Sequence, residues 1–488
     1  MRQKSAIRDS LRLRRAHCSA KVPRLLACLF LLGICGCVTP PLSEYQRQAA
    51  GDAQARANIS GQASRVRGGK ELSTAVEVLP LVQGELDEAA VTQVALVNNP
   101  GLALQYADLG IARSALLRAA RPPNPTAEAS ARFGENHTDA VDIKALQDIV
   151  ELALLPRRKH AAERELDAAK DRLTAKIMGT ALEARSVFAE YQTALALADT
   201  KRQAADCREA AADVARRMTE AGNMTVLERS VFDQGYQAAR LDLAAWQVQV
   251  RTKREAVNRV MGLHEDTSWT AKPADAMADV SGTPKTGVDL AALNASLELS
   301  AQRHELEALA QQRGIINTKA YLPELRVGVD SERASDGSWA VGPALVLTLP
   351  LFEQGQGQRA AVDFQIQAGW NRYAATAVAI ASAARAAADR LDAAGQSLKM
   401  QREEVLPLSD KALKETLLQY NGMLVGVFDL LRAKERQIEA AVRLAETAQE
   451  CRLARLALQH ALAGGSPMAG TTPALPAQGQ GDGGKDGH

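Results

Sequence analysis

The feature of the sequence that most restricts its fold is a stretch of 116 residues, from Arg157 to Lys272, that contains no proline. One proline inside a helix costs about 3 kcal/mol, so this stretch is suited to very long helices. Apolar residues recur in it at a mean spacing of 3.56 residues, between the periods of a straight helix and a coiled coil. The stripe consists of Leu166, Ala169, Leu173, Ile177, Ala181, Ala184, Phe188, Tyr191, Leu195 and Ala198. The spacing therefore predicts a helix with one face buried over many turns.

A turn is predicted at 221–225, where Gly222 and Asn223 tolerate the left-handed conformation that ends helices. The segment 157–263 is then a helical hairpin, whose first helix would extend about 96 Å. The segment 358–462 predicts a second hairpin, with an interruption at Pro407 and a turn near Asn421 and Gly422.

The order of elements is repeated about 198 residues apart. The first repeat is predicted at 86–263 and the second at 289–463, each with a helix, two strands and a long hairpin. Residues 264–288 contain Pro273, Pro284 and several Gly and Ser, and predict a connector. Repetition on this scale indicates duplication of one structural unit.

The strands are predicted in two regions, about 126–155 and about 325–349. Their segments, 126–134, 144–155, 325–331 and 341–349, alternate apolar with small or polar residues. Membrane-spanning strands have about 9–11 residues and this period of two. Because a closed membrane barrel needs at least about eight strands, several chains must share one barrel if these segments enter a membrane. By periodicity alone, a coiled-coil rod with loops in these places is an equal alternative.

Composition restricts the class of function. Few aromatic residues, 18 in all, and abundant Ala favour a mainly helical fold. Outside residues 1–36 the net charge is −5, which does not suit nucleic-acid binding. Four of the six cysteines lie in the first 37 residues and the seven His are scattered, so neither a disulfide framework nor a metal site is expected. No catalytic constellation is visible, so we expect no enzyme and no cofactor.

The N-terminus predicts export from the cytoplasm. A basic segment precedes an apolar run, Leu25 to Ile34, that is too short to span a bilayer. The run ends in Ile34-Cys35-Gly36-Cys37, which resembles the lipobox of bacterial lipoproteins. Residues 1–36 are therefore predicted to be a lipoprotein-type signal peptide, with lipid on Cys37; a signal peptide without lipid is the alternative.

The two flanking segments predict little chemistry. Residues 37–85 are rich in Gln, Ala, Gly and Ser and predict a tether or a wrapping arm. Residues 464–488 are rich in Gly, Pro and Ala and predict a disordered tail. In the body of the chain, Cys207 and Cys451 should stay unpaired, because they would lie about 22 Å and 43 Å from their hairpin turns.

Several motifs occur together in the order of a known family. They are Ala95-Leu-Val-Asn-Asn-Pro100 with the later Asn124-Pro125, Ala320-Tyr-Leu-Pro-Glu-Leu325, Val341-Gly-Pro, Leu349-Pro-Leu-Phe352 followed by Gly355-x-Gly357, and Tyr420-Asn-Gly-Met-Leu-Val-Gly-Val-Phe-Asp-Leu-Leu-Arg-Ala433. With the duplication, residues 86–463 resemble the TolC-type outer membrane efflux proteins. The Asn-Pro entry and the Pro-Asn-Pro before the first strand look most like the heavy-metal efflux branch.

The resemblance implies a mainly α fold with a β membrane part, in which three chains close a 12-stranded barrel in the outer membrane and an α-helical tunnel in the periplasm. It implies a lipid-anchored homotrimer in outer membrane lipid that works with a periplasmic adaptor and an inner-membrane pump. The chain would be a passive conduit for small solutes, with heavy-metal cations as one candidate cargo. Two alternatives stay open: a lipid-anchored coiled-coil structural protein of the envelope, and the outer membrane channel of a polypeptide secretion system.

The hairpin turns are the predicted adaptor contacts, because helix ends leave unpaired backbone groups that a partner can use. They comprise Gly222, Asn223, Met224, Thr225, Gly422, Met423, Leu424 and Val425. Gly422 lies one place earlier than the turn glycine usual in the family.

The resemblance also places Asp429, nine residues after Tyr420, at a periplasmic constriction. Three copies would form a ring of carboxylates that favours cations. Arg432 follows one helical turn later and would pair with Asp429 as a latch. A solvated surface pair is the alternative.

A basic run, Arg157, Arg158 and Lys159, begins the first hairpin. These side chains either contact lipid phosphate or solvate the start of the helix. Solvation is the preferred interpretation.

Overall fold

The computed structural model describes residues 40–57, 82–133, 138–264, 268–273, 287–333 and 337–465. The predicted signal peptide, Cys37 and nearly all of the predicted tail lie outside these residues. The chain divides into two compact units. The sheet unit comprises Met1–Tyr45, Gly110–Asp167 and His304–Ala368, and the hairpin unit comprises Gln46–Leu109, Ala168–Arg303 and Gly369–His488.

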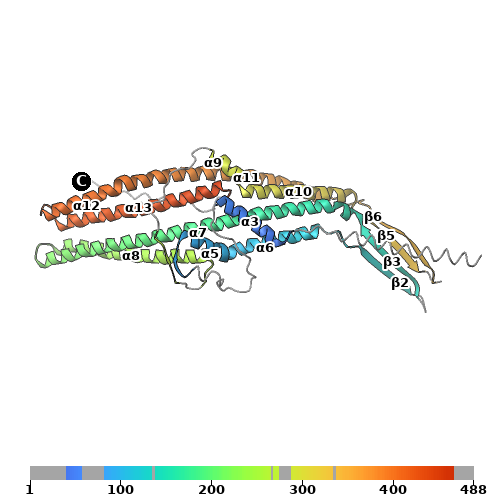
Figure 1. The fold of residues 1–488 in the computed structure, drawn as a ribbon, viewed down its shortest axis with the longest axis horizontal. Coiled ribbons are helices and arrows are strands. Elements are labelled where there is room, and N and C mark those ends of the chain that lie inside the picture. The colour runs from blue at the N-terminus through green and yellow to red at the C-terminus, as the bar shows by residue number, and fades with distance from the viewer. Residues whose placement is uncertain are drawn as a thin grey trace, which may run out of the picture. The chain divides into compact units, whose positions relative to one another are not determined.

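The sheet unit contains one antiparallel sheet of four strands, in the order β2-β3-β5-β6 (Figure 1). The strands are β2 (Thr126–Phe133), β3 (Thr138–Asp148), β5 (Glu324–Arg333) and β6 (Trp339–Thr348). Each repeat supplies one strand pair, and β3 and β5 join the two pairs. Within the described residues, β2 and β6 each pair with one strand only, so the sheet has two open edges.

The predicted end of the first strand pair is wrong. Residues 149–155 are not strand, because helix α7 (Ile149–Glu220) begins there and includes Pro156. The Asp148 carboxylate accepts a hydrogen bond of 3.1 Å from the Glu151 N–H at this helix start. Val150 and Leu154 are buried four residues apart, which is the helical spacing. An apolar run of this length fits either a strand or a helix, and the cap at Asp148 favours the helix.

The hairpin unit contains most of the two predicted helical hairpins, from Ala168 and from Gly369 onward. In the first, α8 (Val226–Met261) runs back along α7 (Figure 1). In the second, α11 (Gln356–Met400) continues into α12 (Leu406–Asn421), which turns into α13 (Val427–Leu462). Seven of the ten residues of the α7 stripe are buried, Ala169 and Ala198 are half-buried, and Leu195 is exposed.

The interruption predicted at Pro407 is a π-helical turn. A π-helical turn, η2 (Gln401–Val405), lies between α11 and α12, and the Leu406 N–H donates to the Gln401 carbonyl. Proline cannot donate the usual helical hydrogen bond and its ring crowds the preceding turn. The wider π turn accommodates this without a break in the helix.

The short helices have the same order in both predicted repeats. Each repeat has a helix pair before its strands, α5 (Glu88–Asn98) with α6 (Pro100–Ala119), and α9 (Val288–Ala295) with α10 (Leu297–Tyr321). The two junctions are Asn99 and Ser296, with ψ of 120° and 117°. Both side chains accept a hydrogen bond of 3.2 Å from the N–H three residues later, so each begins the next helix.

The predicted tether contains a helix, α3 (Leu42–Ala57), that acts as a wrapping arm. In the first repeat, the side chains of Asn98 and Asn99 donate to the last carbonyls of α8 at 2.8–3.0 Å. The second repeat lacks this amide pair at Ala295 and Ser296. There Arg56 of the arm donates to the Ala295 carbonyl at 2.8 Å and to the Ala463 carbonyl at 3.5 Å. In the second repeat Arg56 therefore supplies the hydrogen bonds that the amide pair supplies in the first.

The arm also has a contact near its beginning. Arg113 Nε of α6 donates to the Pro40 carbonyl at 3.0 Å, within the sheet unit. The described chain is therefore held from Pro40, its first residue.

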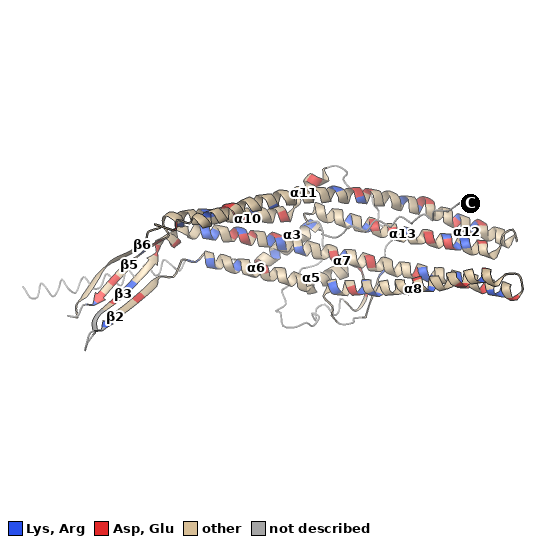
Figure 2. Cartoon of the chain, turned by 180° about the vertical axis from the view of Figure 1, so that it is seen from behind, with Lys and Arg blue, Asp and Glu red and all other residues tan. Residues whose placement is uncertain are grey.

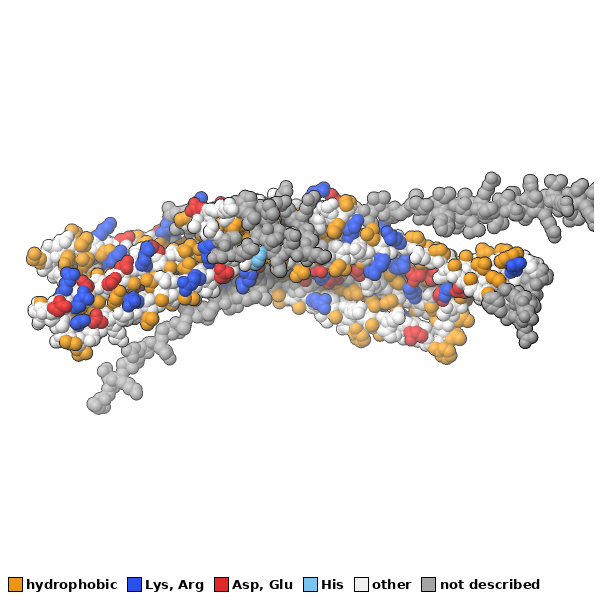
Figure 3. Space-filling view, turned by 90° about the horizontal axis from the view of Figure 1, so that it is seen from below, with side chains coloured by type: hydrophobic (Ala, Val, Ile, Leu, Met, Phe, Trp, Pro, Cys, Tyr) orange, Lys and Arg blue, Asp and Glu red, His pale blue; other side chains and the backbone are white. Residues whose placement is uncertain are grey.

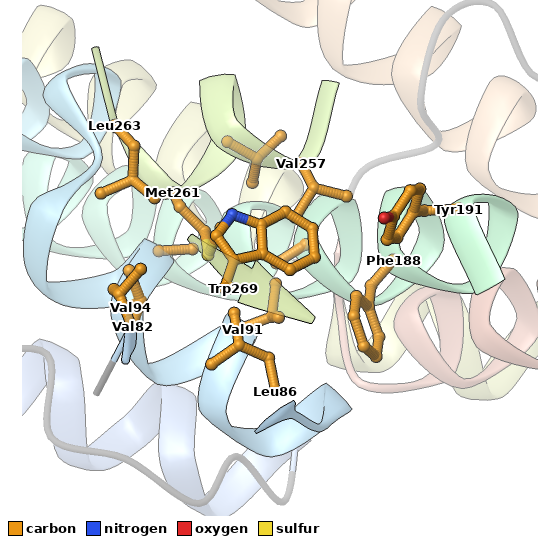
Figure 4. Packing of buried hydrophobic residues seen from close by; sticks show 13 residues of the cluster. Val82, Leu86, Val91, Val94, Phe188, Tyr191, Val257, Met261, Leu263 and Trp269 are labelled. Carbon is orange, nitrogen blue, oxygen red and sulfur yellow. The ribbon is translucent and has the colours of Figure 1, made fainter. Parts of the chain in front are cut away.

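The predicted connector contributes to the core. Strand β4 (Trp269–Ala271) pairs in parallel with β1 (Gly84–Leu86), which ends the predicted tether. Trp269 is 1% exposed, contacts Tyr191 edge-on at 5.3 Å and donates from Nε1 to Asn258 at 2.9 Å (Figure 4). The Arg254 guanidinium lies 4.4 Å from the ring centre. These parts of the tether and the connector are therefore structural.

Candidate functional site

One face of the sheet is mostly apolar, although Gln147, Ser331 and Arg333 also lie on it. Residues directly opposite each other across strands share a face, and residues along a strand alternate. The register places Ala129, Val141, Ile143, Ala145, Leu325, Val327, Val329, Val341, Pro343, Leu345 and Leu347 together. Most of the large side chains are exposed, including Val341 at 69% and Leu345 at 67%. Figure 3 shows hydrophobic side chains gathered over the strands. A face of this kind requires an apolar environment.

The opposite face is charged. Its acids are Glu128, Asp142, Asp148, Glu324, Asp330 and Glu332, and its bases are Arg132, Lys144 and Arg326. Lys144 Nζ lies 3.2 Å from the Asp330 carboxylate directly across the strands, and Arg132 lies 3.0 Å from Asp142. The strands contain 8 to 11 residues, close to the length of membrane-spanning strands. The sheet can therefore separate lipid from water.

A helix that crosses a membrane requires sufficient length and hydropathy. None of the described helices is both long and apolar enough to cross a membrane.

The two hairpin turns have the same backbone geometry. In the first, Gly222 has φ of 77°, and the Asn223 N–H donates to the Met218 carbonyl at 2.8 Å. In the second, Met423 has φ of 60°, and the Leu424 N–H donates to the Gln419 carbonyl at 2.8 Å. Met423 therefore occupies the place of Gly222, because Gly422 precedes the left-handed position by one residue.

The helices that leave the turns are capped alike. Thr225 and Glu228 form a capping box, in which the Glu228 N–H donates to Thr225 Oγ1 at 3.2 Å. The Glu228 carboxylate accepts from the Thr225 N–H at 2.9 Å and from its hydroxyl at 2.8 Å, and these two bonds hold the pKa of Glu228 below its usual value. In the second turn Gly426 replaces the threonine, and its N–H donates to the Asp429 carboxylate at 3.2 Å. Asp429 is therefore the helix-capping counterpart of Glu228.

The structure places Asp429 and Arg432 on exposed positions of α13. Within the described part of the chain no ion pair joins them, and Asp429 bonds to the backbone instead. A ring at a constriction involves several copies, so that role stays a prediction.

The turns expose apolar side chains. Met423 is 93% exposed, Leu424 79% and Leu227 79%, whereas Met224 is half-buried. Behind the turns the two hairpins contact each other, since Phe232 of α8 stacks on Phe428 of α13 at 4.4 Å. Exposed apolar side chains on a fixed turn suit a protein contact.

Two exposed seams run along the helices, and the sequence analysis missed both. Their members are spaced alternately three and four residues apart, as in a coiled coil. On α8 they are Leu227, Val231, Gln234, Ala238, Leu241, Ala245 and Val248, and on α11 they are Phe364, Ala368, Asn371, Ala375, Val378 and Ser382. A coiled-coil seam is stable when another helix covers it. The seams on α8 and α11 are therefore suited to packing against further helices.

The described residues contain two cysteines, both free. Cys207 and Cys451 form no disulfide, as predicted, and burial raises the pKa of both thiols. Among the described residues no group of three or more His, Cys, Asp or Glu side chains could hold a metal ion.

Comparison with known proteins concerns the fold. No family model matches the sequence, and a search of curated proteins finds no match. Solved structures do match. CusC, described with transmembrane channel formation, has a TM-score of 0.65 at 16% identity, over 84% of this chain and 97% of its own.

Two further channels are similar. The outer membrane protein VceC of Vibrio cholerae has a TM-score of 0.62 at 19% identity, over 78% of this chain and 96% of its own. The MtrE outer membrane channel of Neisseria gonorrhoeae has a TM-score of 0.63 at 17% identity, over 77% and 88%. The chain thus has the fold of outer membrane channels. It is the TolC-type fold that the sequence motifs resembled.

Proposed function

We propose that this protein is the outer membrane channel of a tripartite efflux system, a passive conduit that exports small solutes. The two-faced sheet carries the proposal, because its apolar face suits lipid and its charged face suits a water-filled lumen. The similarity in fold to outer membrane channels supports the same role.

The conduit is a homotrimer. One chain leaves two open sheet edges, β2 and β6, which are costly in lipid. Pairing these edges between three copies closes a barrel of 12 strands. The same assembly offers helices of neighbouring copies to cover the seams on α8 and α11. The coiled-coil alternative required loops at the strand positions, and the structure has strands there.

A matched pair of variants on β6 tests the assignment of the two faces. Leu345→Arg puts a charge on the apolar face, and Gly342→Arg puts one on the charged face, where a Cβ meets open space. An arginine facing the centre of a bilayer costs about 2–4 kcal/mol, so Leu345→Arg should impair insertion and heat-resistant trimers. Gly342→Arg should insert normally and weaken cation preference in planar bilayers.

The outcomes separate the classes of function. A structural envelope protein would form no conductance, and both variants would assemble like the wild type. Equal insertion of Leu345→Arg and Gly342→Arg would overturn the membrane assignment.

A periplasmic adaptor and an inner-membrane pump are the proposed partners, and the hairpin turns are the proposed contacts. The exposed Met423 and Leu424 support this. Charged replacements such as Met224→Arg or Leu424→Arg should abolish efflux and leave trimers intact. Full resistance in such variants, with crosslinks to the adaptor only elsewhere, would contradict it.

A lipid on Cys37 is the proposed anchor, and its support is the lipobox-like sequence. Labelled palmitate should enter the wild type, and Cys37→Ser should abolish labelling. The variant should still insert, less efficiently, because acyl chains add about 0.8 kcal/mol per buried methylene. Persistent labelling would exclude Cys37 as the site.

Heavy-metal cations are the proposed cargo. The motifs near Pro100 and Pro125 support this, together with the excess of acids on the charged face. A strain without the protein should become sensitive to metal salts more than to hydrophobic drugs. The opposite pattern would assign drugs as the cargo.

A further inference from the structure

The helix ends that adjoin the sheet are strongly basic. We define the collar as the eleven residues on the helical side of each strand, 115–125, 149–159, 313–323 and 349–359, all in the sheet unit. The collar holds eight bases and two acids, whereas the whole chain has a net charge of only +2. The bases are Arg118, Arg121, Arg157, Arg158, Lys159, Arg313, Lys319 and Arg359, and the acids are Glu151 and Glu353. Figure 2 shows blue segments at the end of α6.

Four of the eight bases are ion-paired. Lys159 lies 3.6 Å from Glu163, and Arg313 lies 2.7 Å from Asp363. Glu151 is shared by two bases, Arg158 at 2.7 Å and Lys319. Arg118, Arg121 and Arg157 are exposed, and no ion pair joins any of them to another described residue.

The unpaired bases lie on packed elements. Arg158 Nη2 donates to the Arg121 carbonyl at 3.3 Å, which brings the end of α6 beside the start of α7. The Arg157 guanidinium covers Gly314 of α10, where an added Cβ would lie 2.1 Å from Nη1. The collar is therefore one surface built from three helices.

The collar also carries exposed apolar and aromatic side chains. Tyr321 at the end of α10 is 78% exposed, and Phe352 after β6 is 95% exposed, with Leu349 and Leu351 at 64% and 71% beside it. At the other end of β6, Trp339 is 54% exposed. Aromatic side chains mark both borders of the apolar band in membrane-spanning sheets. The bases therefore lie at the depth of lipid headgroups.

We propose that the collar binds the phosphate groups of anionic phospholipids, through Arg118, Arg121 and Arg157. The proposal rests on the proposed function, in which the sheet spans a membrane. A guanidinium matches a phosphate in charge and in its pair of donors. For Arg157 this proposal replaces the interpretation preferred from the sequence, in which the side chain only solvates the start of the helix. That interpretation is kept for Lys159, because Lys159 pairs with Glu163 at 3.6 Å.

The test measures partition of the purified full-length protein between two kinds of vesicle, one of phosphatidylcholine and one of equal parts phosphatidylcholine and phosphatidylglycerol. The wild type should insert into both and prefer the anionic vesicles. Each base near an anionic surface contributes about fivefold, so the variant Arg118→Gln, Arg121→Gln, Arg157→Gln should lose about 100-fold of the preference. Binding to the neutral vesicles should not change.

A charge-matched control removes three exposed arginines of the hairpin unit, as Arg251→Gln, Arg259→Gln and Arg436→Gln. It should keep the preference of the wild type. If the collar variant inserts into neither vesicle, a salt titration of the wild type tests the proposal instead. The preference of the wild type for anionic vesicles must fall as ionic strength rises past about 0.1 M.

Three outcomes would overturn the proposal: equal insertion of the wild type into both vesicles, an unchanged preference in the collar variant, or an unchanged preference at high salt. Stronger competition by inorganic phosphate than by chloride at equal ionic strength would also overturn it in favour of a site for the free ion. Failure of the wild type to insert anywhere would contradict the proposed function instead.

Discussion

Gly328 is the residue on which the joint between the two repeats depends most directly. It lies on β5 opposite Leu146 of β3, and a Cβ there would be 1.8 Å from the Ala145 carbonyl oxygen. An ordinary contact begins at 3.4 Å, so the strands would have to separate by most of the missing 1.6 Å. This is about a third of the spacing between paired strands.

We expect Gly328→Ala to destabilise the sheet by about 2–4 kcal/mol. Overpacking accounts for about 1–3 kcal/mol, and each lost ladder hydrogen bond adds about 1 kcal/mol. Urea titration of protein inserted in vesicles measures the effect, with the heat-resistant fraction on gels as the readout. Gly342→Ala on β6 is the control, because its Cβ meets nothing within 4 Å. Identical urea midpoints for the two variants would refute the close approach at Gly328.

The remaining predictions concern the hairpin turns. Asp429→Asn removes the charge but keeps an acceptor for the helix cap, whereas Asp429→Ala removes both. If Asp429 forms a carboxylate ring, both variants should raise resting conductance and weaken cation preference in planar bilayers. A change in Asp429→Ala alone would assign Asp429 to the cap. Met423→Gly should slow hydrogen exchange of its turn about 5- to 30-fold, and Gly222→Ala should speed it similarly, because a left-handed non-glycine residue costs about 1–2 kcal/mol. Unchanged rates would contradict the left-handed geometry. The capping box holds the pKa of Glu228 below 4.5, so its stabilisation is present above that pH and is lost as the pH falls through the lower folded pKa. Protection factors in the first turn of α8 should fall over that range, and Thr225→Ala should remove most of this pH dependence.

The long elements were predictable because their signals are simple. Absence of proline and a spacing near 3.5 residues sufficed for the first hairpin, and repetition of the same plan indicated the second. Alternation sufficed for most of β5 and β6. The start of α7 was not predictable in this way, because Val150 and Leu154 fit a buried strand until the Asp148 cap is seen. Local pattern alone does not decide between a strand and a helix over so few residues.

Other features depend on contacts that are distant in sequence. Trp269 was assigned to a connector because its neighbours include Gly and Pro, yet it pairs with β1 and packs on Tyr191. A wrapping arm was one of the two predictions for residues 37–85, but its helix was not predicted, because the buried side chains are alanines, such as Ala49 and Ala53, which give a weak apolar signal. The capping role of Asp429 required the turn to be placed one residue later than Gly422 indicated.

The contact between Arg113 and Pro40 gives a second measure of membrane depth. Cys37 lies three residues before Pro40, so covalent geometry limits its distance to about 11 Å. Arg118 follows Arg113 by five residues on α6, a rise of about 8 Å. In the proposed assembly, a diacylglyceryl group on Cys37 would enter the bilayer within a short reach of the collar arginines. The lipid and the collar would then set the depth of the sheet in the same leaflet, and inserting residues before Pro40 should uncouple the two.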